Sequence, residues 1–206
     1  VAAAKDEGYD GFSNIQQGGA VIAFNLGATV TCAGGKPEPA CTGKADGTKI
    51  AYGLSKDGSE DSTLQVMEVA TGRILPERIP DTQLGYVLHW HPDGSGFFYN
   101  QLTGKVGTPE RYLDSRARYH RLGTDPANDR IVMARGLDPA VAFEKIQVPA
   151  VLTSPTSEHA VLVLGDVRQE FRLLIAPLAD VGAGTAKWQH LADFSDEVTD
   201  LAINGD

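Results

Sequence analysis

The stretch HWHPDGSGFFYN, residues 89–100, contains the turn on which the fold assignment depends. Asp93-Gly94 is a turn dipeptide, and it separates two runs rich in large apolar residues, GYVLHW (85–90) and GFFYNQL (96–102). A dipeptide of this type between two such runs predicts a β-hairpin. The question is then whether the same turn recurs along the chain.

The turn recurs at a fixed interval. Asp46-Gly47 precedes Asp93-Gly94 by 47 residues, and two further turn signals, Ser157-Glu158 and Asn204-Gly205, are again 47 residues apart. The middle interval is 64 residues, and most of the excess is the polar, Gly-rich segment 103–115, which we interpret as a loop inserted in one repeat. Such insertions are tolerated because loop-closure entropy grows only logarithmically with length.

Short runs of β-branched and aromatic residues fill the intervals, and none has the length and period of a helix. A period in the forties with four strands per unit is typical of a β-propeller blade. We therefore expect an all-β protein of about three blades, each with four antiparallel strands. The first blade has KIAYGL (49–54), TLQVMEV (63–69) and GRILPERI (72–79) as its last three strands. The second blade has GYVLHW and GFFYNQL, given above, followed by ARYHRL (117–122) and RIVMAR (130–135). The third blade has KIQVPAVLT (145–153), HAVLVLG (159–165), FRLLIAPL (171–178) and WQHLADF (188–194). The run VTDLAI (198–203) opens another blade.

The composition excludes several classes of function. The chain has 206 residues and a net charge of −9, so it offers no basic surface for nucleic acid. Its longest apolar stretch, residues 19–30, is interrupted by Asn25 and is too short to span a membrane. We expect a soluble protein of the cytoplasm or the periplasm. Cys32 and Cys41 flank a short loop, and the sequence permits either a disulfide or two free thiols.

The candidate metal sites fail on ligand number and context. His89 and His91 lie on the same side of a strand, but a zinc site needs three or four ligands, and the other histidines (His120, His159 and His190) come from other strands without a motif spacing. Asp57 to Glu68 imitates the spacing of a calcium loop, but Ser62 stands where that loop needs glycine, and helices do not flank it. We expect no metal and no cofactor.

Several segments in the same order resemble the propeller domain of prolyl oligopeptidase, a family of serine peptidases. They are DGTKIAYGLSKDGSEDSTLQVMEVATGRILPERIP, WHPDGSGFFYN, RYHRLGTDPANDRIV and LADFSDEVTDLAINGD. The resemblance covers residues 46–206, whereas residues 1–45 do not align and form an unassigned extension. It implies part of a seven-bladed propeller that sits over an α/β-hydrolase domain and admits only short peptides, which the enzyme cleaves after proline. The partners implied are that catalytic domain and short proline-containing peptides.

The resemblance assigns no catalytic residue to this chain. The family's chemistry needs a serine on a G-x-S-x-G elbow, and the nearest match, GLSKD (53–57), lacks the second glycine and the following helix. The chain alone is therefore expected to be inactive. The resemblance places Met133 near the rim of the substrate pocket, and the alternative is that Met133 fills a gap between blades. A stand-alone propeller that binds a protein partner is the alternative function.

Overall fold

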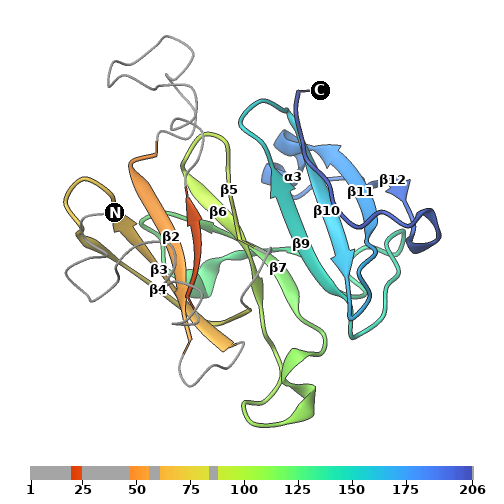
Figure 1. The fold of residues 1–206 in the computed structure, drawn as a ribbon, viewed down its shortest axis with the longest axis horizontal. Helices are drawn as coiled ribbons and strands as arrows, with labels where there is room; N and C mark the ends of the chain where they lie inside the picture. Colours follow the sequence, from red (N-terminus) through yellow and green to blue (C-terminus); the bar gives the residue numbers. More distant parts are fainter. Residues whose placement is uncertain (1–19, 25–46, 56–60, 84–87, 206) are drawn as a thin grey trace.

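The computed structural model describes residues 20–24, 47–55, 61–83 and 88–205, and its regular secondary structure is mostly β-strand with little helix (Figure 1). The strands are β1 (Ala20–Phe24), β2 (Lys49–Leu54), β3 (Asp61–Glu68), β4 (Ile74–Gln83), β5 (His89–Trp90), β6 (Gly96–Gln101), β7 (Arg116–Arg121), β8 (Arg130–Met133), β9 (Val148–Thr153), β10 (His159–Gly165), β11 (Arg172–Pro177) and β12 (Gln189–Ala192). The helical segments are α3 (Leu178–Ala183) and the 3₁₀ turns η2 (Pro109–Tyr112), η3 (Pro126–Asn128) and η4 (Phe194–Asp196).

The strands form three antiparallel units of four, which we call unit one (β1–β4), unit two (β5–β8) and unit three (β9–β12). Within each unit every strand pairs with the next one along the chain. Figure 1 shows the units side by side, from orange through green to blue. The prediction of two consecutive four-stranded antiparallel blades within residues 85–194 is confirmed.

The predicted turns occupy equivalent places in the units. Asp93-Gly94 joins the first strand of unit two to the second, and Ser157-Glu158 does the same in unit three. Gly47, just before the second strand of unit one, has φ 68°, and Gly94 has φ 72°. Glycine suits both positions because a side chain at positive φ costs conformational energy. The 47-residue interval from Gly47 to Gly94 therefore marks one structural position, whereas Asn204-Gly205 follows a run that is not a strand.

The middle unit is packed on both faces because the side chains of β6 alternate between two cores. Phe97 and Tyr99 lie in a cluster shared with unit one, while Phe98 lies in a second cluster shared with unit three. All three side chains are almost fully buried, at 0 to 1% exposure. Large aromatic side chains of this kind supply most of the burial energy that holds neighbouring sheets together.

The first strands of the units lie next to one another. Strand β5 contacts β1 on one side and β9 on the other. The hydroxyl of Thr153 in β9 donates to the backbone carbonyl of Trp90 in β5, with 2.5 Å between the oxygens. Strand β8 stands at the opposite edge of unit two. In a propeller the first strand of each blade faces the central axis and the last strand faces the outer rim. These three units are arranged in the same way and form an open arc.

Three features differ from the sequence analysis. A strand, β1, lies within the extension 1–45 and pairs with β2 in register from Ala20 opposite Leu54 to Phe24 opposite Ile50. Units one and two are joined into one eight-stranded sheet, through a single pair between Thr82 and Gln101. The run VTDLAI (198–203) was predicted to be a strand, and that prediction is wrong.

The run VTDLAI instead covers a face of unit three. Val161 and Val163 of β10 point away from unit two, and Val198, Leu201 and Ile203 pack against the cluster that they form. A backbone hydrogen bond from Phe171 N to Val198 O, 2.8 Å long, attaches the segment. A strand needs a ladder of such bonds, so the run buries its apolar side chains without becoming a strand.

Candidate functional site

Met133, the predicted pocket residue, lies at the junction of units two and three. Its side chain is 1% exposed and belongs to the core cluster that the two units share. It also lines a cavity of about 330 Å³. The walls of the cavity come from Arg130–Met133 of β8, from Leu137–Pro139, and from Val181, Gly184, Ala186 and Trp188 of unit three. This burial fits the alternative interpretation, in which Met133 fills space between two blades. The interpretation of Met133 as a residue at the rim of the substrate pocket stays a prediction.

Arg130 connects the two walls of this cavity. Its Nη2 donates to the backbone carbonyls of Val181 and, at 3.1 Å, Gly182, near the C-terminus of α3. A cation suits this end of a helix because the terminal carbonyls carry partial negative charge. Burial lowers the pKa of the Arg130 side chain from its usual value. Gly184 ends α3 at φ 78°, and an added Cβ there would lie 3.3 Å from Arg130 Nη1.

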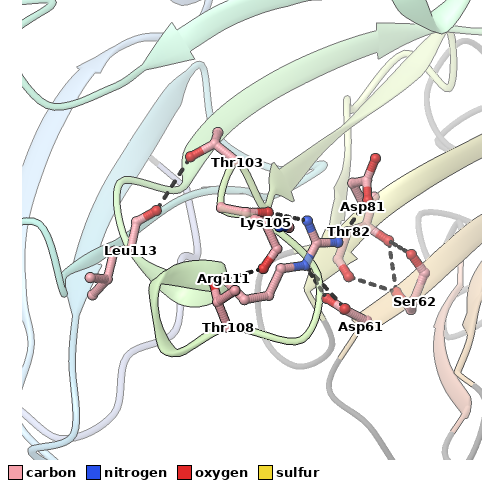
Figure 2. A network of polar contacts seen from close by, with 10 residues as sticks. Asp61, Ser62, Asp81, Thr82, Thr103, Lys105, Thr108, Arg111 and Leu113 are labelled. Carbon is pink, nitrogen blue, oxygen red and sulfur yellow. Dashed lines mark hydrogen bonds and ion pairs between the residues drawn. The ribbon is translucent and has the colours of Figure 1, made fainter.

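A second polar centre lies between units one and two, around Arg111 of η2 (Figure 2). Its Nε donates to both carboxylate oxygens of Asp61, at 2.8 and 3.0 Å, and its Nη2 donates to Asp81 at 2.7 Å. Nη1 donates to the carbonyl of Gly104 at 2.8 Å. Burial acts to lower the pKa of Arg111, but the hydrogen bonds to Asp81 and Asp61 outweigh it and raise the pKa. The guanidinium therefore stays charged.

The Arg111 centre fixes the inserted loop to unit one. Arg111 belongs to the predicted insertion 103–115, whereas Asp61 and Asp81 belong to β3 and β4. Beside it, the hydroxyls of Ser62 and Thr82 are 2.7 Å apart and bond across the same two strands (Figure 2). The segment was predicted only as an inserted loop, and no spacing in the sequence connects its arginine to the two aspartates. The structure shows it to be a clasp between units, which we call the Arg111 clasp.

Apart from His89 and His91, which are two residues apart in the chain, the histidines come from separate strands. His91 pairs with Asp93 at 2.7 Å in the β5–β6 turn, and His190 lies 3.8 Å from Asp193 at the surface. His120 is fully buried, and its Nδ1 lies 2.9 Å from Oδ1 of Asp129. Within the part of the chain that the structure describes, no three His, Cys, Asp or Glu side chains come together as a metal site. Cys32 and Cys41 lie outside the described residues.

The buried pair His120 and Asp129 has the composition of an acid–base dyad, but its surroundings are structural. Tyr99 donates to the other oxygen of Asp129 at 3.0 Å. Burial and the charge of Asp129 raise the pKa of Tyr99. Because His120 has no exposed surface, a substrate cannot reach it. The network joins β6, β7 and the residue before β8, and we assign it to stability.

Two carboxylates of the calcium-like sequence, those of Asp61 and Glu68, are bound by arginines. Asp61 accepts from Arg111, as described above, and Glu68 accepts from Arg73 Nε at 3.1 Å and from the Thr71 hydroxyl at 3.0 Å. The hydrogen bonds from Arg73 and Thr71 lower the pKa of Glu68. The residues 57–60 of that sequence lie outside the described part.

No helix in the described ranges is long and apolar enough to cross a bilayer.

Comparison with known proteins supports one family. Residues 42–148 match the family model of the prolyl oligopeptidase N-terminal beta-propeller domain, which is more than half of the chain. Prolyl oligopeptidase A of Amanita bisporigera is 28% identical over 179 residues, which is 77% of this chain and 23% of that protein. Prolyl oligopeptidase A of Galerina marginata is 33% identical over 107 residues, or 42% of this chain and 14% of that protein.

The solved structures give the same fold. Prolyl oligopeptidase B of Galerina marginata, bound to a 35-residue substrate, superposes with a TM-score of 0.60 at 20% identity, covering 87% of this chain and 24% of that one. One of two prolyl endopeptidases studied for the role of inter-domain dynamics in catalysis superposes with a TM-score of 0.58 at 22% identity, covering 72% and 21%. The chain thus spans less than a quarter of the length of each of these relatives.

Proposed function

Since the chain belongs to the prolyl oligopeptidase family, as a part of its N-terminal β-propeller domain, we propose that it is a segment of a substrate gate. The gate would serve a serine endopeptidase that cleaves short peptides after proline. The observation that carries the proposal is the match over residues 42–148, which spans β2 to β4 of unit one and all of unit two. In this account residues 46–206 are the partial propeller, and the extension 1–45 contributes one strand, β1, to unit one.

The gating role rests on the order of the strands. The first strands β1, β5 and β9 are neighbours, so in a closed ring of such units they would surround an axial passage. The width of that passage would limit the size of the peptides that reach a catalytic serine in an α/β-hydrolase domain, the partner we propose. We also propose that Met133, which lies between two blades, contacts the peptide.

Activity assays test the proposal on two proteins. The 206-residue chain alone is expected to leave a chromogenic proline-amide peptide uncleaved and to resist labelling by a serine-reactive phosphonate. The reason is that a catalytic triad and an oxyanion site supply the catalysis, and neither is assigned to this chain. The product of the complete reading frame is expected to cleave the short peptide and to leave a folded protein with exposed prolines intact. Labelling of a serine in the 206-residue chain, or equal cleavage of short and long substrates by the complete protein, would contradict the proposal.

A further inference from the structure

The cavity between units two and three has the composition of a small-molecule site. Its volume of about 330 Å³ lies at the lower end of the range for ligand pockets. Its wall combines apolar and polar surface in similar amounts, and the apolar part includes Met133 and Val181, which are buried, and Trp188, which packs against the same core cluster. Leu137 is 53% exposed and therefore lies where the cavity meets solvent. A pocket of this kind accepts an apolar group of a few carbon atoms.

One cation and one anion complete the wall. The Nη2 atom of Arg130 donates to two backbone carbonyls. Within the described residues, its Nη1 and Nε atoms make no hydrogen bond, and no carboxylate forms an ion pair with Arg130. Asp138 uses Oδ1 to accept from Ala140 N at 2.9 Å, and its Oδ2 has no bond in the same part of the chain. Both side chains are only partly exposed. Each therefore has hydrogen-bonding capacity left for a ligand.

We propose that this cavity binds a zwitterion with an apolar side chain, either a free amino acid such as leucine or a dipeptide with both termini free. The ligand's carboxylate would accept from Arg130, its ammonium group would donate to Asp138, and its side chain would lie against Met133 and Trp188. A guanidinium is suited to a carboxylate because its N–H groups form a planar fork. Partial desolvation, which also lowers the pKa of Arg130, favours a negatively charged partner.

The site is distinct from the passage of the proposed gate. Arg130 and Met133 belong to β8, the edge strand of unit two opposite β5. The first strands, which would surround the passage, lie at the other edge. A ligand here would bind between two blades and contact both, since β8 and α3 come from different units. The inference stands on the cavity and does not depend on the peptidase assignment.

The two tryptophans of the chain make a direct test possible. Trp188 lines the cavity, whereas Trp90 belongs to the core between units one and two and serves as an internal reference. With ¹⁵N-labelled tryptophan the 206-residue chain gives two indole signals, which Trp188→Phe assigns. Leucine and Ala-Leu are expected to shift the Trp188 signal and to saturate it at about millimolar concentration, while the Trp90 signal stays in place. The stronger of the two ligands identifies the natural size of the zwitterion.

Chemical variants of the probe test each contact in the unaltered protein. Ala-Leu amide lacks the carboxylate and is expected to bind about tenfold or more weakly, as is N-acetyl-Ala-Leu, which lacks the ammonium group. Asp138→Asn keeps the oxygen that accepts from Ala140 and removes the charge, so it should weaken Ala-Leu but not N-acetyl-Ala-Leu. Arg130→Met should weaken every carboxylate probe about tenfold or more. The matched control is Arg135→Met, at an exposed arginine paired with Asp114.

Three outcomes would overturn the proposal, and two of them need no variant. The first is a Trp188 signal that does not move up to about 10 mM leucine or Ala-Leu, above the millimolar affinity expected. The second is equal binding of Ala-Leu and its amide. The third is an Arg135→Met variant that loses as much affinity as Arg130→Met. If Arg130→Met does not fold, the comparison of acid and amide probes still decides the question.

Discussion

Replacing Arg111 with methionine removes the cation of the Arg111 clasp while keeping most of its apolar volume. Arg111 is 5% exposed, and Asp61, Asp81 and the carbonyl of Gly104 would each lose the hydrogen bond that it donates. Breaking a buried ion pair costs about 3–5 kcal/mol. The side chains of Asp61 and Asp81 are 26% and 48% exposed, so water solvates them in part. We therefore expect a loss of about 2–3 kcal/mol in the free energy of unfolding.

Thermal and urea unfolding, followed by far-UV circular dichroism, measure this loss. For a chain of this size it corresponds to a fall of about 4–12 °C in Tm. The matched control is Arg135→Met, which removes an arginine whose pair with Asp114 is exposed on both sides and should leave Tm unchanged. The reasoning is refuted if Arg111→Met melts with the unaltered chain, or if Arg135→Met loses as much stability.

Three further predictions concern pH, backbone packing and association. The hydrogen bond from Arg168 lowers the pKa of Asp166 to about 2, so Asp166 stabilises the fold above the unfolded pKa of about 4 and this contribution is lost as pH falls through 2. Asp166→Asn should thus lower the urea midpoint at pH 7 but not at pH 2, and an equal deficit at both pH values would show that the charge is not responsible. Gly96→Ala should reduce Tm sharply, because the added Cβ would lie 2.0 Å from His120 O. The control is Gly182→Ala in α3, where the added Cβ has open space and Tm should stay unchanged or rise. Similar Tm values for the two variants would disprove the packing argument. The open arc leaves strand edges uncovered, so light scattering should show the isolated chain to associate, and a monomer at high concentration would argue against an open arc.

The strands of units two and three could be predicted from the sequence because their signals are local. The turn Asp93-Gly94 and the apolar run of β10 each depend on a few neighbouring residues. In the structure, Val161 and Leu162 of β10 pack into opposite clusters. The helix α3 gave no signal because its six residues are too few to show a 3.6-residue period.

The polar centres could not be predicted because they combine residues that are distant in the chain. Arg111 bonds to an aspartate 50 residues earlier, and Arg130 bonds to a carbonyl 51 residues later. Neither pair has a characteristic spacing. Met133 was selected through the family resemblance, whereas the cavity beside it depends on how α3 and Trp188 close against β8. The run VTDLAI has the composition of a strand but lacks a full set of backbone partners.

Sequencing of the reading frame beyond Asp206 tests the central claim most directly. If the chain is part of the gate of a prolyl oligopeptidase, the frame continues with further four-stranded units, and a G-x-S-x-G elbow with its aspartate and histidine follows them. The relatives have this much room, since the chain spans 23% of the Amanita bisporigera protein. A frame that closes within a few residues of Asp206, or that continues into a domain without a serine elbow, would contradict the account.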